Sequence, residues 1–180
     1  DIARLRQLEA PVRDARLFAD LAGSQAGGLA GSATRLRLKI YQHGGALPLS
    51  DAVPALENFG FRVLAEVASE LGGDDPVTIH DFTLALAPGL DPAPILARAP
   101  AVEEALRCVL NTSAENDPFN RLVVSVGLSA QEAEWLRAFY RYLRQASIAY
   151  TINTVVDALA GAPAVSRGLV ALFRVAHDPA

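Results

Sequence analysis

The chain has 180 residues, a length that fits one domain or two small ones. Apolar residues make up 51% of the sequence and charged residues 20%, so we expect a globular core rather than a disordered chain. The net charge of −4 provides no basic surface for nucleic acid. Apolar runs stay shorter than the roughly 18 residues that a membrane span requires. Nucleic-acid binding and membrane insertion are therefore not expected.

The cysteine content and the start of the chain predict the cellular compartment and the kind of chain. Cys108 is the only cysteine, which excludes internal disulfides and fits a reducing compartment. It flanks an apolar helical stripe, so we expect a small buried thiol. The chain starts at Asp1, contains no methionine and has no signal-peptide pattern. We expect an internal piece of a longer cytoplasmic protein.

The first 33 residues hold two short elements and a loop. Residues 1–9 have apolar positions at helical spacing, and Pro11 ends that helix. Alternation favours a strand at residues 12–21, and residues 22–33 have the glycine, serine and alanine composition of a loop.

The segment from Leu36 to Val67 has the clearest pattern, a strand, a helix and a second strand. In the first strand, near residues 35–42, apolar and basic residues alternate, which predicts an antiparallel strand with one buried face. The helix is expected near residues 50–59, with Ser50 as its N-cap and Gly60 in the left-handed conformation that ends it.

Two more strands complete this first part of the chain. In the strand near residues 61–70, alternation predicts one face made of Phe61, Val63, Ala65 and Val67. Residues 71–76 form a hairpin turn, and a further strand is expected near residues 77–86. Acidic Glu66, Glu70 and Asp81 would then pair across the sheet with Arg35, Arg37 and Lys39.

After residue 89 the period changes to that of helices. We expect a helix near residues 92–113, a short helix capped by Asp117 and ended by Gly127, and a longer helix opened by the capping box of Ser129 and Glu132. Its apolar face comprises Leu136, Phe139, Tyr140 and Leu143. Two more helices are expected at residues 151–160 and 163–176, the last with Val165, Leu169, Leu172 and Phe173 facing inward.

Few residues of this sequence are candidates for catalysis or metal binding. His43, His80 and His177 lack the spacing of a metal pair, and we expect surface or strand-edge roles for them. Neighbouring His80 and Asp81 would face opposite sides of a strand. We therefore assign no catalytic, cofactor-binding or metal-binding residue.

Two features are compatible with a binding role as well as with a purely structural role. Gly44 and Gly45 link a strand to a helix start, either as a plain turn or as a corner whose free N–H groups bind an amino-acid effector. Arg137, Arg141 and Arg144 share one side of the long helix, as a solvated flank paired with Glu134 or as a contact with another domain. The polar residues 115–121 are explained by turn and cap roles.

Several blocks of sequence resemble the large bacterial NAD-specific glutamate dehydrogenases. The blocks are Leu36–Tyr41, Leu47–Asp51, Leu56–Val63, Ile79–Phe82, Glu115–Val123 and Leu136–Gln145. This resemblance implies a region that precedes the catalytic domain, with an ACT-like regulatory module followed by helices. The family deaminates L-glutamate oxidatively to 2-oxoglutarate and ammonia with NAD.

The resemblance implies no catalytic residue here, since no position matches the family's catalytic lysines. Lys39, the only lysine, is expected on the wet face of a strand. The expected partners are other domains and subunits of a homo-oligomeric enzyme and an amino-acid effector, with NAD bound elsewhere in the parent protein. A stand-alone amino-acid sensor and a structural spacer are the alternatives.

The expected fold is α+β, with an ACT-like or ferredoxin-like antiparallel sheet that carries helices on one face over residues 1–113. An all-α segment follows over residues 114–180. A ferredoxin-like sheet needs a fourth strand beside the strand at residues 35–42. We expect the segment at residues 12–21 to fill that edge from the N-terminal side, in a permuted arrangement.

Overall fold

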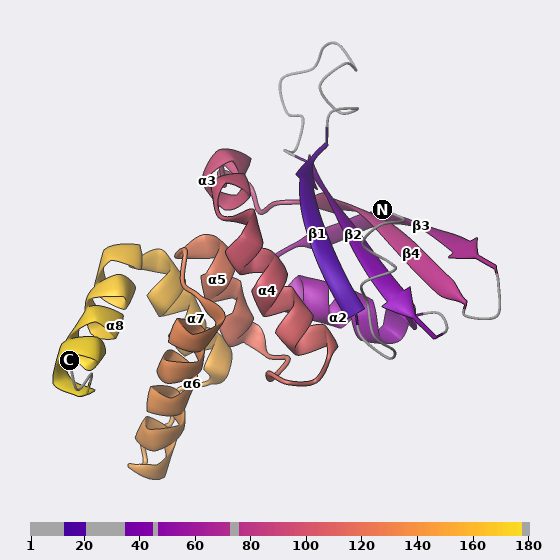
Figure 1. The fold of residues 1–180 in the computed structure, drawn as a ribbon. Helices are drawn as coiled ribbons and strands as arrows, with labels where there is room; N and C mark the ends of the chain where they lie inside the picture. Colours follow the sequence, from indigo (N-terminus) through magenta and orange to yellow (C-terminus); the bar gives the residue numbers. More distant parts are fainter. Residues whose placement is uncertain (1–12, 21–34, 45–46, 73–75, 178–180) are drawn as a thin grey trace.

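A computed structural model describes residues 13–20, 35–44, 47–72 and 76–177 of the chain. Its first part is a four-stranded antiparallel sheet with the order β1-β2-β4-β3 (Figure 1). The strands are β1 (Arg13–Ala19), β2 (Arg35–His43), β3 (Arg62–Leu71) and β4 (Val77–Ala85). The α+β class and all four expected strands are confirmed. The helix expected at residues 1–9 and the loop expected at residues 22–33 lie outside the described residues.

Strand β1 fills the sheet edge beside β2, as the permuted arrangement predicts. It pairs antiparallel with β2, with Leu17 opposite Leu38 and Ala15 opposite Ile40. Leu38, Ile40 and Ala15 are fully buried, which confirms that this side of the two strands faces the core. The first strand along the chain thus completes a unit whose other strands all come later.

Helices α2 (Leu49–Asn58) and α4 (Ala99–Leu110) cover the buried face of the sheet, and their inward side chains join one core with it. The chain reaches α4 through the short helix α3 (Pro92–Ala97). The single helix expected near residues 92–113 is therefore wrong. The helix breaks at Arg98 because Pro100, in the first turn of α4, has no N–H to continue the ladder of α3.

The start of α2 differs from the prediction, whereas its end agrees. The residue before α2 is Pro48, and no side chain caps the helix, so the N-cap role expected of Ser50 is wrong. At the other end, Gly60 has a φ of +86°. The N–H of Phe61 donates to the Leu56 carbonyl over 3.1 Å, which with the Gly60–Glu57 bond forms a Schellman motif.

The predicted face of β3 is only half right, because the strand contains a β-bulge. The register skips Leu64, so that Val63 lies opposite Leu84 and Ala65 lies opposite Thr83. An extra residue in one strand reverses the alternation beyond it. Val67 is accordingly 63% exposed, whereas Glu66 lies on the helix-covered side, opposite buried Phe82.

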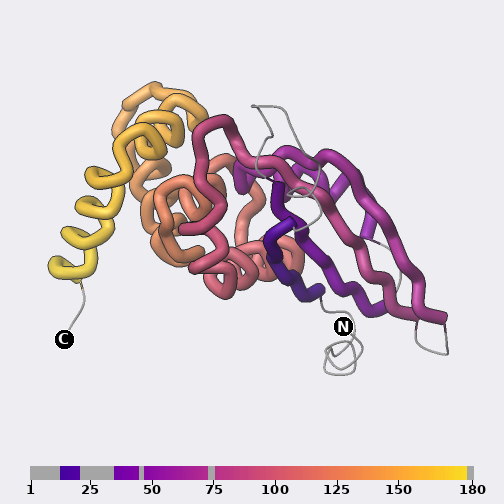
Figure 2. The backbone as a smooth tube through the Cα atoms, turned by 90° about the horizontal axis from the view of Figure 1, so that it is seen from above, coloured from indigo at the N-terminus to yellow at the C-terminus, as the bar shows by residue number. Residues whose placement is uncertain are grey.

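The second part of the chain consists of helices at one end of the sheet (Figure 2). They are the 3-10 helix η1 (Pro118–Asn120), α5 (Arg121–Ser125), α6 (Ala130–Gln145), α7 (Ile152–Gly161) and α8 (Pro163–His177). The capping box at the start of α6 is confirmed, since Ser129 and Glu132 exchange both hydrogen bonds. A second core forms among these helices, with Phe119, Leu122, Leu136, Val156 and Val170 inside.

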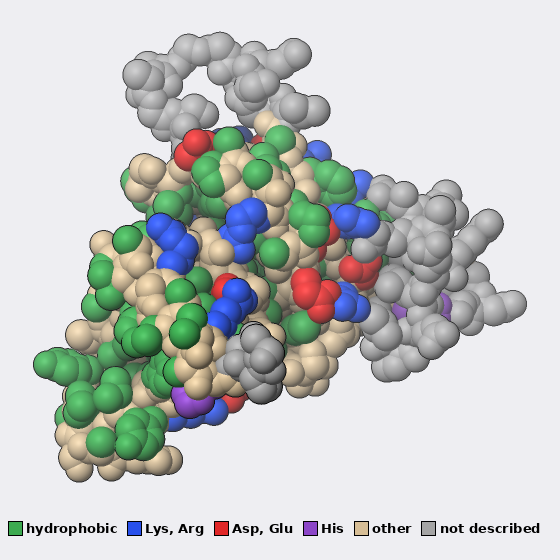
Figure 3. Space-filling view, turned by 60° about the vertical axis from the view of Figure 1, so that its left-hand side comes forward, with side chains coloured by type: hydrophobic (Ala, Val, Ile, Leu, Met, Phe, Trp, Pro, Cys, Tyr) green, Lys and Arg blue, Asp and Glu red, His purple; other side chains and the backbone are tan. Residues whose placement is uncertain are grey.

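The predicted inward face of α8 is confirmed at Phe173, which packs against Trp135 and Phe139, and is wrong at the other three positions. Val165, Leu169 and Leu172 are 59%, 41% and 67% exposed, whereas Ser166 and Val170 face the core. Phe139 and Leu143, on the predicted apolar face of α6, are 36% and 39% exposed. In Figure 3, hydrophobic side chains gather at the lower left, the part of the molecule that holds α8 and the end of α6.

Among the described residues, no single helix is both long and apolar enough to cross a membrane. Helices α7 and α8 meet that criterion only when they are taken together across a bend of 101°, and only on length and composition.

Candidate functional site

The corner between β2 and α2 contains the glycines singled out as an effector site. Gly44 has a φ of +78°, which confirms that the turn needs a left-handed residue. Its N–H donates to the carbonyl of Pro76 over 2.9 Å, and the Leu47 N–H donates to Nε2 of His80 over 3.1 Å. The expectation of a free N–H group is therefore wrong for Gly44. Gly45 lies outside the described residues.

His80 holds this corner in place, and the surface role expected for it is wrong. The residue is 3% exposed, and its Nδ1 lies 2.8 Å from a carboxylate oxygen of Glu66. Because Nε2 accepts a hydrogen bond from the Leu47 N–H, the ring hydrogen is on Nδ1, which donates a hydrogen bond to Glu66. His80 therefore links the β2–α2 corner to β3. Sequence reasoning placed Glu66 on the other face, because it did not foresee the bulge.

The opposite face of the sheet carries the expected cross-strand pairing in part. Arg37 forms an ion pair with Asp81 through two hydrogen bonds. This pair lies on the face away from the helices, so His80 and Asp81 do face opposite sides, as predicted. His80 and Asp81 therefore cannot act together as a general base and the carboxylate that orients it.

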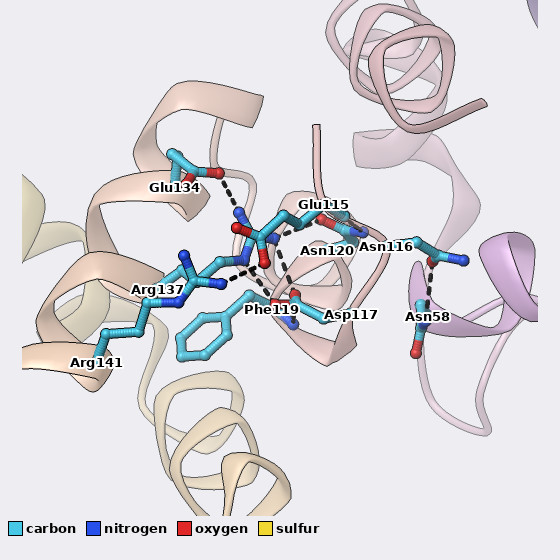
Figure 4. Close-up of polar contacts among 9 residues, drawn as sticks. All are labelled: Asn58, Glu115, Asn116, Asp117, Phe119, Asn120, Glu134, Arg137 and Arg141. Atoms are coloured by element: carbon cyan, nitrogen blue, oxygen red, sulfur yellow. Dashed lines mark hydrogen bonds and ion pairs between the residues drawn. The ribbon is translucent and has the colours of Figure 1, made fainter. Parts of the chain in front are cut away.

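An extended polar cluster surrounds Arg137 of α6 (Figure 4). Its Nε and Nη2 donate to the two carboxylate oxygens of Asp117 over 2.6 and 2.9 Å, and Nη2 also donates to the amide oxygen of Asn120 over 3.0 Å. Glu134 accepts from Nη1, and the guanidinium carbon lies 5.8 Å from the centre of the Phe119 ring. Arg137 is 2% exposed, so this is a buried fork-shaped ion pair.

Local structure explains why these groups converge. Asp117 is the N-cap of η1, and its Oδ1 accepts from the N–H of Phe119 over 3.0 Å, as the cap role predicts. Burial lowers the pKa of Arg137, but the hydrogen bond and the charge of Asp117, with the charges of Glu134 and Glu115, more than offset it and raise the pKa. The guanidinium therefore stays charged inside the helical unit.

The three arginines, predicted either as a solvated flank paired with Glu134 or as a contact with another domain, do not form one patch. Arg137 does pair with Glu134, which confirms that pairing, but it is buried, so its placement on a solvated surface is wrong. Arg141 pairs with Glu115, and this hydrogen bond lowers the pKa of Glu115. Arg144 is exposed near the end of α6. A contact of Arg141 and Arg144 with another domain stays a prediction.

A junction joins the sheet unit to the helical unit. Asn58, at the end of α2, donates to the side chain of Asn116 over 2.9 Å. The side chain of Arg121 passes close to Gly60, where an added Cβ would lie 3.1 Å from its Cγ. Val123, Val124 and Ala133 of the helical unit belong to the core of the sheet unit. The two units therefore pack as one block.

Two hollows on either side of Gly127 have arginines in their walls, which sequence reasoning missed. The larger, of about 410 Å³, contains Arg98, and both are lined by Arg167. Arg98 donates to the carbonyls of Leu128 and Val123 over 3.1 and 3.4 Å, and Arg167 donates to the carbonyl of Val126 over 3.1 Å. These arginines thus satisfy carbonyls at and beyond the end of α5.

The remaining candidates are the thiol of Cys108 and a metal site. Cys108 is half-buried and its Sγ lies 3.6 Å from a carboxylate oxygen of Glu104, so the expectation of a fully buried thiol is wrong. Within the described ranges, no three His, Cys, Asp or Glu side chains are grouped to hold a metal ion.

The sheet with its permuted edge strand and the helical unit at one end of it define the class of protein: an ACT-type α+β module with a helical appendix. Comparison with known families agrees with both parts. Residues 25–95 match the ACT3 domain of glutamate dehydrogenase, and residues 114–179 match its helical motif 3.

Individual relatives lead to the same family. The chain is 35% identical to the NAD-specific glutamate dehydrogenase of Halomonas elongata over 146 residues, and 36% identical to that of Pseudomonas aeruginosa over 148 residues. The enzyme of Mycobacterium tuberculosis is 34% identical over 149 residues. These matches cover 81%, 81% and 79% of the chain. The chain belongs to the NAD-specific glutamate dehydrogenase family, and it spans 9% of the length of each relative.

Proposed function

We propose that this chain is a non-catalytic regulatory and assembly region of an NAD-dependent glutamate dehydrogenase. In this proposal, another domain of the same cytoplasmic, homo-oligomeric enzyme binds NAD and converts L-glutamate to 2-oxoglutarate and ammonia. The chain itself holds the surrounding parts of the enzyme in a fixed position relative to one another.

One observation carries the proposal: the sheet unit and the helical unit are built as one block. Asn58 and Asn116 join the two units, and Val123, Val124 and Ala133 of the helical unit lie in the core of the sheet unit. Within the helical unit, Arg137 fixes η1 against α6 with a buried ion pair. Buried ion pairs contribute little net stability compared with apolar packing but specify one arrangement. A block of this kind suits a part that transmits or holds position, rather than one that opens around a substrate.

The non-catalytic part of the proposal is tested at Lys39. The Lys39→Met substitution is made in the full-length enzyme, and kcat for glutamate oxidation is measured by NADH formation. We expect kcat within about twofold of the unmodified enzyme, because removal of a catalytic acid or base lowers rates by roughly 10²–10⁴-fold. A loss of that size would refute the proposal, as would NADH formation by the 180-residue chain alone.

The regulatory part is tested by calorimetry with a panel of amino acids. The β2–α2 corner is the site under test. Its Gly44 and Leu47 N–H groups are already bonded to Pro76 and His80, so an effector there binds through other groups of the corner. A Gly44→Val variant strains the turn at a φ of +78° and should abolish any heat of binding, whereas Gly168→Ala in α8 should leave it unchanged. If no amino acid gives heat or a thermal shift, the region is a scaffold without a sensor.

A further inference from the structure

Helix α8 has apolar side chains on the side that faces away from the protein. Its packed side consists of Ser166, Val170 and Phe173, which face α6 and α7. The outer side carries an apolar row that we call the α8 stripe: Val165, Leu169, Leu172 and Val175, which are 59%, 41%, 67% and 85% exposed. Their spacing of three and four residues puts them along one side of the helix.

The two arginines of α8 do not interrupt this stripe. Arg167 donates to the carbonyl of Val126, and Arg174 pairs with Glu132 and lies over the Trp135 ring, so both point toward the protein. The sequence of α8 contains no acidic residue.

Exposed apolar side chains also lie on α6, against which the packed side of α8 rests. The Phe173 ring lies 5.2 Å from the ring of Phe139, which is 36% exposed, and Leu143 follows one turn later with 39% of its surface exposed. Figure 3 shows this concentration of hydrophobic side chains at the end of the molecule that holds α8. Contiguous apolar patches of this kind mark interaction surfaces.

The exposed charges beside Leu143 on α6 are basic. Arg144 lies exposed at the end of α6, next to exposed Tyr142. Arg141 is the neighbouring cation, and its pairing with Glu115 is solvent-exposed. A complementary surface therefore combines apolar side chains with acidic residues at its rim.

The comparisons with known proteins bear on which polypeptide supplies that complementary surface. The helical-motif match runs through residue 179, so α8 with its stripe is part of the matched family region. The chain spans 9% of the length of its relatives, which leaves most of a dehydrogenase polypeptide to cover the patch. We propose that the α8 stripe docks an apolar, acid-flanked helical surface from another part of the same dehydrogenase polypeptide. This inference rests on the proposed assembly function.

Site-specific photocrosslinking in the full-length enzyme tests the proposal. Benzoylphenylalanine replaces Leu172, and in a matched control it replaces Glu57, an exposed residue of α2. After irradiation, crosslinked peptides are identified by mass spectrometry, with and without vesicles of anionic phospholipid. We expect several-fold more crosslinked peptide from position 172 than from position 57, joined to an apolar segment with Asp or Glu at its borders.

Three results would overturn the docking proposal: no crosslink above the control, crosslinks only to the stripe of a second copy, or crosslinks to lipid when vesicles are present. A second variant, Leu169→Asp with Leu172→Asp, should lower the thermal transition of the full-length enzyme and leave that of the 180-residue chain unchanged. If the short chain unfolds equally early, the stripe has a local packing role and the docking proposal fails. The Lys39→Met kinetics are independent of these outcomes, so failure of docking and failure of the non-catalytic assignment are distinguishable.

Discussion

Arg137 gives the sharpest test of what holds the helical unit together. Arg137→Met keeps the aliphatic stem and removes a guanidinium that is 2% exposed. Asp117 and Asn120 then lose the guanidinium N–H donors that lie 2.6–3.0 Å away. The Asp117 side chain is 17% exposed, so water replaces these donors only in part. Removing one partner of a buried ion pair costs about 3–5 kcal/mol, because the other charge stays buried without compensation. For a chain of this size that corresponds to a fall in Tm of roughly 6–20 °C.

The assay is urea and thermal unfolding of the 180-residue chain, followed by circular dichroism. Arg141→Met is the matched control, since it removes a guanidinium of the same helix whose pair with Glu115 is exposed. Exposed pairs contribute little, so its transition should stay close to that of the unmodified chain. Arg137→Lys should fall between, because an ammonium cannot donate to Asp117 in the same forked geometry. Equal, small shifts for Arg137→Met and Arg141→Met would refute the reasoning.

Other predictions concern turns, caps and pH, each measured by urea unfolding. Gly60→Ala should lose about 1–2 kcal/mol, because the φ of +86° is unfavourable for alanine, whereas Gly168→Ala inside α8 should gain roughly 0.5–1 kcal/mol. Ser129→Ala should lose about 1 kcal/mol through its capping box; no change would contradict the box. The hydrogen bond with Arg141 lowers the pKa of Glu115, so its contribution is present above the ordinary value of 4.5 and is lost as the pH falls through the lower, folded value. Glu115→Gln should lack that component of the pH dependence.

The sheet was predictable because its signals are local. Leu36, Leu38 and Ile40 alternate with basic residues, and β2 buries that side. Gly60 follows a helical pattern and takes the left-handed conformation that ends α2. The edge position of β1 needed one further step, because a ferredoxin-like sheet lacks a strand at that edge without it. Periodicity and fold rules were together sufficient for β1 and β2, but not for β3, whose bulge they did not predict.

The helices were less predictable, because periodicity shows that a face is apolar but not what covers it. Val165, Leu169 and Leu172 were assigned to the interior on their spacing, but the core takes Ser166 and Val170 instead. Ser166 fits there because its hydroxyl donates to the Leu159 carbonyl over 2.7 Å. Nothing in the local sequence distinguishes an apolar side that packs within a chain from one that packs against another part of the protein.

The polar sites were missed because they depend on contacts distant in sequence. Arg137 and Asp117 are 20 residues apart, and their pairing follows from the packing of η1 against α6. The link from His80 to Glu66 has a different origin. The bulge at Leu64 brings Glu66 to the helix-covered side, where simple alternation had placed Val67. One extra residue in β3 thus produced a buried histidine pair and reversed the predicted face.

The bulge can be tested directly at the two valines of β3. In the bulged register, Val67 is 63% exposed and Val63 packs against the core. Val67→Asp should therefore cost less than about 1 kcal/mol, the spread of strand propensities. Val63→Asp should cost about 2 kcal/mol or more, because it desolvates a carboxylate without a partner. A regular strand with the alternation read from the sequence buries both valines, so it predicts equal and large losses. Urea unfolding of the two variants decides between the registers, and a Val67→Asp loss as large as that of Val63→Asp would show that β3 runs without the bulge and that Glu66 does not reach His80.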